Sequence, residues 1–301
     1  MTSLETDMRR VELSSGDSDH MASKTKSLLR TLKHRAAHWA VCVLYPWPRG
    51  KRLKNGLTLK IDPKKRWIDL NLALRSHYEE GTLLLIEKLL PEGGVFVDVG
   101  ANIGVMSTFA ARHVGDKGLV FAFEPDAVNF ARLTWARRAN RLPQMLPFPV
   151  ALGANRGVAL LMGAPDGDGG LSSLVKLEGF QEQSTVPVVR MDEYLLTFDP
   201  ARIDLIKIDV EGFEKDVVEG AAKVFECYKP AVIMEMVNDD AVRAGEALCR
   251  LGYRSFVAGE KGAMTLDEVC ETVPKKLVHN NMLFVHASKT ETLSSLAANN
   301  A

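Results

Sequence analysis

Short apolar runs alternate with segments of helical periodicity along most of this chain. The runs GVFVDVG (94–100) and LVFAFEP (119–125) are nearly continuous in apolar residues, as buried parallel strands are, and each carries an acid near its end. Between them, IGVMSTFAARHVG (103–115) has helical spacing and a closing glycine. The segment DAVNFARLTWARRAN (126–140) predicts a second helix, with Asp126 as its N-terminal cap.

The alternation continues beyond residue 140 and predicts the fold class. Further strands are expected at 145–152, 203–210, 231–237, 253–259 and 281–287, and further helices at 213–228 and 240–252. Strands and helices at this spacing predict an α/β fold with a doubly wound, mostly parallel sheet of the Rossmann-like type. The glycine- and aspartate-rich stretch 157–177 interrupts the alternation and predicts a hairpin or loop insertion beside the cleft.

The two ends of the chain are expected to lie outside the main domain, which we assign to residues 71–290. Residues 1–22 offer few apolar anchors and predict a disordered tail, and residues 291–301 are expected to form a C-terminal tail. Residues 23–70 are expected to form an N-terminal extension of helix and strand, with the strand at 56–62. A single helix is predicted around residues 71–90, ended by the proline and glycines that follow it.

Residues 24–45 of this extension, KTKSLLRTLKHRAAHWAVCVLY, pass from basic to aromatic and aliphatic positions. One interpretation is a basic amphipathic helix that makes peripheral contact with an anionic membrane surface. The other, which we favour, is an N-terminal helix packed on the main domain with its lysines in water.

The turn after the first main strand predicts the kind of ligand. Ligands of such sheets lie beyond the carboxyl ends of the strands. Gly100, Asn102 and Gly104 have the spacing GxNxG, whereas a dinucleotide site needs GxGxxG so that the backbone can approach a pyrophosphate. Glu124 ends the next strand, where an acid can accept both hydroxyls of a ribose, and Asp98 can hold an ammonium group or orient the turn. This combination disfavours NAD and fits S-adenosyl-L-methionine best.

Composition and charge limit the kinds of binding partner and the cellular location that we expect. Lysine plus arginine equals aspartate plus glutamate at 38 each, so the chain has no net charge that would favour nucleic acid. The four cysteines form no metal-binding pattern and fit reduced thiols. The N-terminus lacks the apolar stretch of a signal peptide, and the longest early apolar run, 39–45, is far shorter than the ~20 residues that cross a bilayer. We therefore expect a cytoplasmic protein; the alternative interpretation of residues 24–45 adds peripheral contact with the inner face of a membrane.

Several short sequence motifs together resemble those of one protein family. They are HYEEGT (77–82), FVDVGANIG (96–104), FAFEPDAVNF (121–130), VALG (150–153), GGLSSL (169–174), VPVVRMDEYL (186–195) and IDLIKIDVEGFEKDVVEGA (203–221). Their order and spacing resemble the FkbM-type S-adenosylmethionine-dependent methyltransferases over roughly residues 75 to 240. The resemblance implies a class I methyltransferase fold, with a seven-stranded sheet whose last strand, 281–287, runs antiparallel. It also implies O-methylation of a sugar, glycan or polyketide-like small molecule.

The resemblance carries site residues over by position. In this family pattern the methionine end of the cofactor meets the turn, the ribose meets Glu124, and the adenine lies near Pro125 and the backbone of 151–152. The cofactor-binding residues expected from it are Tyr78, Glu79, Asp98, Gly100, Ala101, Asn102, Gly104, Glu124, Pro125, Ala151, Leu152 and Ser173.

Catalytic residues are expected at the end of the fourth main strand. If this strand stays extended, Lys207, Asp209 and Glu211 lie on one side of it. Asp209 is the first candidate for the base that accepts or orients the proton of an acceptor hydroxyl; Glu211 is the second, and Lys207 would steady either carboxylate. Asp209 and Glu235 could together hold Mg²⁺, which prefers oxygen ligands, although no dedicated metal ligand is predicted.

Two other classes of function compete with this prediction. A nicotinamide-dependent oxidoreductase is disfavoured by the GxNxG turn and by the lack of a Tyr-x-x-x-Lys pair. A non-catalytic nucleoside-binding module of the same fold is the other alternative, because a fold alone does not imply activity.

Overall fold

A computed structural model describes residues 43, 49–63, 67–75, 78–163, 172–175, 179–258, 266–269 and 281–289. The predicted tails at 1–22 and 291–301 lie outside these residues, as does all of 24–45 except Val43. Residues 164–171 and 176–177 of the predicted insertion also lie outside them.

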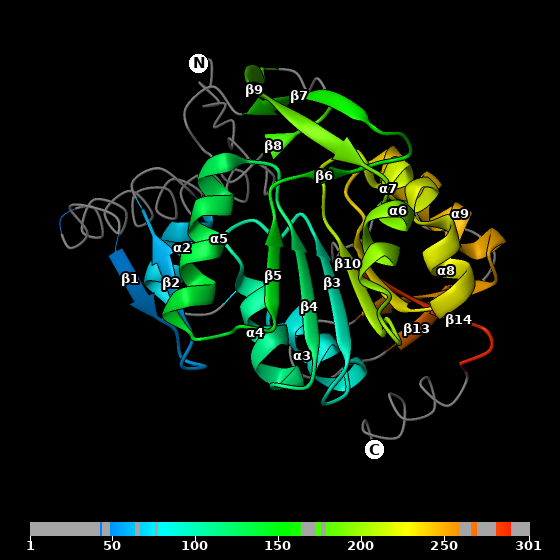
Figure 1. The fold of residues 1–301 in the computed structure, drawn as a ribbon, viewed down its shortest axis with the longest axis horizontal. Helices are drawn as coiled ribbons and strands as arrows, with labels where there is room; N and C mark the ends of the chain where they lie inside the picture. The colour runs from blue at the N-terminus through cyan, green and yellow to red at the C-terminus, as the bar shows by residue number, and fades with distance from the viewer. Residues whose placement is uncertain are drawn as a thin grey trace, which may run out of the picture.

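An eight-stranded sheet forms the centre of the molecule, with the strand order β13-β12-β14-β11-β10-β3-β4-β5 (Figure 1). The five parallel strands are β3 (Val95–Val99), β4 (Leu119–Phe123), β5 (Met145–Phe148), β10 (Leu205–Ile208) and β11 (Ala231–Glu235). The others are β12 (Tyr253–Ala258), β13 (Leu266–Val269) and β14 (Asn281–His286). Each of the seven segments in which a main strand was predicted contains a strand of this sheet, and β14 runs antiparallel to both β11 and β12, so the predicted class I fold is confirmed. The edge strand β13 is an addition to it.

Helices bury both faces of this sheet, and alternate residues of each central strand point to opposite faces. In β3, Phe96 belongs to the core under α3 (Glu80–Leu89), α4 (Val105–Val114) and α5 (Ala127–Ala139). Its neighbours Val95 and Val97 belong to the opposite core. That core lies under α6 (Met191–Leu195), α7 (Glu214–Gly220), α8 (Ala222–Tyr228) and α9 (Asp239–Arg250); the short 3-10 helix η1 (Leu196–Phe198) follows α6. Burial on both faces explains why the strands read as apolar runs.

Two predicted helices are each divided in the structure. The helix expected over 71–90 is instead α2 (Trp67–Arg75) followed by α3, and Glu79 before α3 has a left-handed φ of 45° that a continuous helix does not allow. The helix expected over 213–228 divides into α7 and α8 at Ala221, whose φ of −114° departs from helical values. The first division matters for function, because it leaves Tyr78 and Glu79 outside any helix.

A second, four-stranded sheet stands above the carboxyl ends of the main strands (Figure 1). It contains β6 (Ala151–Leu152), β7 (Gly157–Gly163), β8 (Ser172–Ser173) and β9 (Gln181–Val189), in the order β6-β9-β7-β8. The single strand predicted at 145–152 was therefore wrong: β5 ends at Phe148, and Ala151 starts a strand of the other sheet. The predicted insertion is a hairpin-like sheet in which β7 pairs antiparallel with β8 and β9.

The hairpin of β1 (Arg49–Arg52) and β2 (Thr58–Ile61) attaches to α5. The guanidinium of Arg132 donates to the Lys60 carbonyl and lies 2.5 Å from Asp69 of α2. Further along α5, the Asn140 amide pairs with both the N–H and the carbonyl of Thr58 at 2.8 and 2.7 Å. Arg132 and Asp69 are both buried, so removal of either one would leave the charge of the other uncompensated. The predicted boundary between residues 70 and 71 falls inside α2, and the domain division stays a prediction.

Candidate active site

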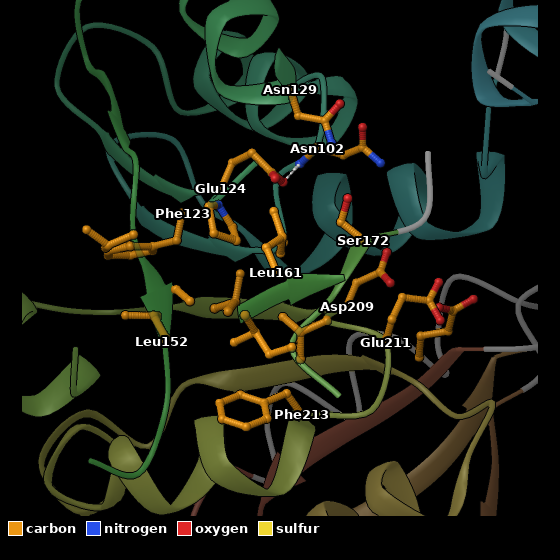
Figure 2. A pocket seen from close by; sticks show the side chains of 18 of the residues that line it. Asn102, Phe123, Glu124, Asn129, Leu152, Leu161, Ser172, Asp209, Glu211 and Phe213 are labelled. Carbon is orange, nitrogen blue, oxygen red and sulfur yellow. Dashed lines mark hydrogen bonds between the residues drawn. The ribbon is translucent and has the colours of Figure 1, made fainter. Parts of the chain in front are cut away.

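A cavity of about 240 Å³ lies between the carboxyl ends of the main strands and the second sheet. It is at the edge where a sheet of this kind binds its ligands. Figure 2 shows Glu124, Asn102 and Asn129 on one side of it, and Asp209 and Glu211 on another. Most of the predicted site residues line it: Tyr78, Glu79, Gly100, Asn102, Glu124, Pro125, Ala151, Leu152, Asp209 and Glu211, together with Glu235.

The turn after β3 directs its amides towards β4. Gly100, Asn102 and Gly104 all have left-handed φ values, of 82°, 50° and 90°. The N–H groups of Gly100 and Ala101 donate to the Phe123 carbonyl, and the N–H of Asn102 donates to Glu124 Oε2 at 2.7 Å. These donors are therefore engaged within the protein and do not form an open cradle for a phosphate. This agrees with the prediction of a ligand without pyrophosphate.

Glu124 is held rigidly at the end of β4. Its Oε2 accepts from Asn102, and its Oε1 accepts from the N–H of Asp126 at 2.9 Å. The side chain is buried, and this burial raises its pKa to about 7 although the two backbone donors act in the opposite direction. Each carboxylate oxygen has a second lone pair, so Glu124 can still accept hydrogen bonds from a ligand in the cavity.

Asp98, Ala101 and Gly104 lie behind the cavity wall, unlike the other predicted residues of the turn. Asp98 is buried, accepts a short hydrogen bond from Ser107 of α4, and pairs in register with Lys207 across β3 and β10. Burial raises its pKa to about 6, against the opposing effects of Lys207 and Ser107. From this position Asp98 links the start of α4 to the strands.

A buried ion pair marks the end of β10. Lys207 Nζ lies 2.5 Å from Asp209 Oδ2, and the lysine is only 3% exposed. Burial alone would lower the pKa of Lys207, but the charges of Asp209, Glu79 and Asp98 raise it above its ordinary value. Burial would likewise raise the pKa of Asp209, yet Lys207 and a hydrogen bond with Glu235 hold it below its ordinary value. Asp209 is therefore an ionised carboxylate at the cavity wall.

Two further acids complete a cluster around Asp209. Ligand atoms of Asp209, Glu211 and Glu235 lie within 4.8 Å of one another. Burial and the Asp209 charge raise the pKa of Glu235, so this residue carries the proton that it shares with Asp209. Burial, then Asp209, raises the pKa of Glu211 to about 7. Glu211 has a left-handed φ of 51°, so the strand does not stay extended and the predicted alternation of 207, 209 and 211 fails after Asp209.

Residues from two other segments close the cavity. Tyr78 and Glu79 line it from the break between α2 and α3, and Thr82 donates to Glu79 Oε2 at 3.1 Å. Burial, followed by the nearby charges of Glu79 and Asp209, raises the pKa of Tyr78 well above its usual range. In β8 the lining residue is Ser172, whereas the predicted Ser173 donates to the Glu211 carbonyl at 2.7 Å and supports that loop.

The apolar part of the wall was not predicted as such. Its members include Phe123 of β4, Leu161 of β7, Val150 directly before β6, Leu174 directly after β8, and Phe213 before α7. The polar Asn129 in the first turn of α5 was also missed, although it lies within the sequence word FAFEPDAVNF. Such apolar positions have no sequence signal that distinguishes them from core residues.

The chain matches the model of the methyltransferase FkbM domain over residues 98–255, which is more than half of its length. It belongs to the FkbM methyltransferase family. The match begins at Asp98 and ends in β12. It includes the turn after β3 and the cavity residues Glu124 and Asp209. A nicotinamide-dependent oxidoreductase is thereby set aside.

The chain is also similar, more distantly, to a curated protein and to solved structures. The hexuronic acid methyltransferase AglP of Haloferax volcanii is 28% identical over 149 residues, which span 49% of this chain and 58% of the relative. A crystal structure of methyltransferase FkbM from Methylobacillus flagellatus is 16% identical, with a TM-score of 0.40, and the alignment covers 71% of this chain and 52% of that one. An S-adenosylmethionine-dependent O-methyltransferase from Thermotoga maritima is also 16% identical, with a TM-score of 0.40, over 69% and 64% of the two chains.

Proposed function

We propose that this FkbM methyltransferase uses S-adenosyl-L-methionine to methylate a hydroxyl of a sugar, a glycan or a polyketide-like molecule. The proposal depends above all on one arrangement, in which Glu124 and the ionised Asp209 line different sides of one cavity. Glu124 suits the uncharged ribose of a nucleoside, and Asp209 suits the proton of an acceptor hydroxyl. Proximity of two bound reactants supplies much of the rate of such a transfer.

The cavity residues fit this cofactor. When bound, S-adenosyl-L-methionine supplies an electrophilic methyl group on a sulfonium. Glu124 would accept the ribose hydroxyls, and Gly100 and Asn102 would meet the methionine end. Pro125, Ala151 and Leu152, with the apolar Phe123 and Leu161, would surround the adenine.

Replacement of Glu124 with alanine should weaken the binding of S-adenosyl-L-methionine. The loss of hydrogen bonds to a charged acceptor costs about 1.5–3 kcal/mol, or roughly 10- to 100-fold in Kd. The raised pKa adds a test: if the ionised form binds, affinity should fall roughly tenfold between pH 8 and pH 6 as Glu124, with its pKa of about 7, becomes protonated. Isothermal titration calorimetry measures both effects.

Glu124→Gln is the matched control for this pH dependence. It keeps the shape of the side chain and one acceptor oxygen but does not titrate, so its affinity should vary little over the same pH range. A Kd of Glu124→Ala equal to that of the unmodified protein, with the melting temperature preserved, would contradict the ribose assignment.

The charge of the cavity restricts the acceptor. Four acids line one part of the wall: Glu79, Asp209, Glu211 and Glu235. Glu235 carries a proton and Lys207 is hydrogen-bonded to Asp209, so the net negative charge that an acceptor meets comes from the other three acids with one cation against them. A further carboxylate within about 4 Å of an ionised one costs roughly 1–4 kcal/mol. We therefore propose a neutral or amino-bearing acceptor, in contrast to the hexuronic acid of the relative's name.

A panel of matched acceptors, read by transfer of a labelled methyl group, tests this restriction. The methyl glycoside of a neutral hexose should be a better acceptor than that of the corresponding hexuronic acid, by at least about tenfold in kcat/KM. Amino sugars added to the same panel show whether a cationic acceptor has a higher kcat/KM than a neutral one. Preferential methylation of the uronic acid would contradict the charge argument while leaving methyl transfer itself supported.

A further inference from the structure

A one-sided set of basic residues lies on the β1–β2 hairpin, α4 and α5, and several of its members gather near the amino ends of β4 and β5, away from the cavity. Residues 49–61, 105–114 and 127–141 contain ten lysines and arginines and no aspartate or glutamate, although the whole chain has no net charge. They form the β1–β2 hairpin and the helices α4 and α5, which pack together. The rest of the chain therefore carries the balancing acidic excess.

Contacts between these elements bring the charges together. Arg112, in the last turn of α4, donates to the Asn55 carbonyl in the hairpin turn at 2.6 Å. A Cβ added to Gly56 would lie 3.4 Å from Nη1 of Arg112 and 3.7 Å from Nη2 of Arg52, so the two guanidinium groups are close neighbours. At the end of α5, the bonds from Asn140 to Thr58 place Arg141 beside the same hairpin. We call Arg52, Lys54, Arg112, Arg138 and Arg141 the basic face.

All five side chains of the basic face are exposed. In the part of the chain that the structure describes, none of them forms an ion pair, and the nearby Asp69 already pairs with Arg132. Exposed acids near the end of α4 are Asp116, which follows the helix, and Glu92, next to Gly93 whose N–H donates to the Val114 carbonyl. Partial burial is the larger cause, and the nearby charge of Arg52 the smaller one, of a lowered pKa of Arg112.

Helix stabilisation explains only part of this set. Arg112 and Arg138 stand in last turns, where cations favour the helix dipole. Arg52 and Lys54 belong to a strand and a turn, so the dipole does not account for them. Like charges gathered at one surface cost stability unless an anionic partner compensates them.

We propose that the basic face binds an anionic phospholipid surface. Basic residues near such a surface are attracted to its negative potential. The sequence directly before β1 favours lipid over nucleic acid, because residues 24–48 add lysines and arginines to the interfacial aromatics Trp39, Tyr45 and Trp47. Those residues lie outside the described part of the chain, and the face itself is assigned from described residues alone. Among the latter, no helix has the length and hydropathy needed to cross a bilayer.

Co-sedimentation of the full chain with vesicles tests the proposal. We expect binding to phosphatidylcholine vesicles that contain phosphatidylserine, loss of this binding at high salt, and no binding to pure phosphatidylcholine. The variant Arg52→Gln/Lys54→Gln/Arg141→Gln should bind about 100-fold more weakly, roughly fivefold for each charge removed. Because the cavity lies at the carboxyl ends of the strands, away from the basic face, the triple variant should bind S-adenosyl-L-methionine as tightly as the unmodified chain.

Two control variants distinguish the effect of the basic face from the effects of net charge and of altered folding. Lys223→Gln/Arg243→Gln removes exposed charges from α8 and α9 and should bind vesicles like the unmodified chain. Arg52→Lys/Arg141→Lys keeps the charge of the face and should also bind normally. Unchanged vesicle binding by the triple variant, absence of binding by the unmodified chain at low salt, or binding to RNA or DNA in place of vesicles would each overturn the proposal.

Discussion

Asp209→Asn is expected to lower turnover by about 10²–10⁴-fold while the Kd for S-adenosyl-L-methionine changes little, because a positioned general base typically contributes that much. Asp209 is the cavity acid whose pKa lies below its ordinary value, so it is ionised and able to accept a proton. Asparagine has nearly the same shape but cannot take the proton. Single-turnover transfer of a labelled methyl group, with calorimetry for the cofactor, measures the two quantities separately.

The buried Lys207 calls for a second variant in this experiment. Asp209→Asn leaves the lysine ammonium without its anionic partner, and a broken buried pair costs about 3–5 kcal/mol of stability. Asp209→Asn/Lys207→Met removes the unpaired charge and should recover much of the melting temperature while turnover stays low. Near-normal turnover in either variant would move the proton acceptor to Glu211 or Glu79, or leave proximity alone to explain the rate.

Chelation addresses the predicted Mg²⁺ at Asp209 and Glu235. The Lys207 ammonium and the proton on Glu235 already compensate Asp209, so we expect EDTA to leave turnover unchanged. Loss of activity with EDTA, restored by added Mg²⁺, would instead assign the acidic cluster to a metal.

Gly100→Ala is expected to lower the free energy of unfolding by at least about 3 kcal/mol, a loss typical of severe steric clashes. A Cβ at this position would lie 1.9 Å from the Asp209 carbonyl oxygen, so β3 and β10 would have to separate. The φ of 82° is also strained for alanine. The same movement would displace Asp209 from the turn that we propose to meet the cofactor, so S-adenosyl-L-methionine should bind more weakly as well. Urea unfolding and calorimetry measure the two effects.

Gly93→Ala is the matched control for the backbone strain alone. Gly93 also has a left-handed φ, of 73°, but the nearest atom to an added Cβ is 3.8 Å away. Its substitution should cost about 1–2 kcal/mol and leave cofactor affinity unchanged. Equal losses for the two variants would show that the close contact with Asp209 is unimportant.

Gly100 illustrates how far the sequence predicts the site. The GxNxG spacing led to the turn, its left-handed residues and its proximity to Glu124, because these are local properties of the chain. A glycine is required at position 100 by the close approach of Asp209, which follows β10 more than 100 residues later, and no local pattern contains this contact. The engagement of the turn amides with Phe123 and Glu124 likewise depends on a neighbouring strand.

The fold was predicted best where burial is symmetrical. Strands buried on both faces, such as β3, give apolar runs that are hard to mistake. The strand β9 was missed because QEQSTVPVV is exposed over its first five residues and contains a proline, so it has no apolar alternation until Val186. Of the neighbouring serines Ser172 and Ser173, both expected near the ligand, only the first lines the cavity, because neighbouring residues of a strand face opposite sides and the sequence does not tell which side is the cavity.

Calorimetric titration of the purified protein with S-adenosyl-L-methionine, S-adenosylhomocysteine and NAD tests the central claim most directly. We expect both sulfur nucleosides to bind at a single site and to be weakened together by Glu124→Ala, with no heat from NAD. Binding of NAD in preference to the sulfur nucleosides, or binding of none of the three by folded protein, would contradict the proposed function.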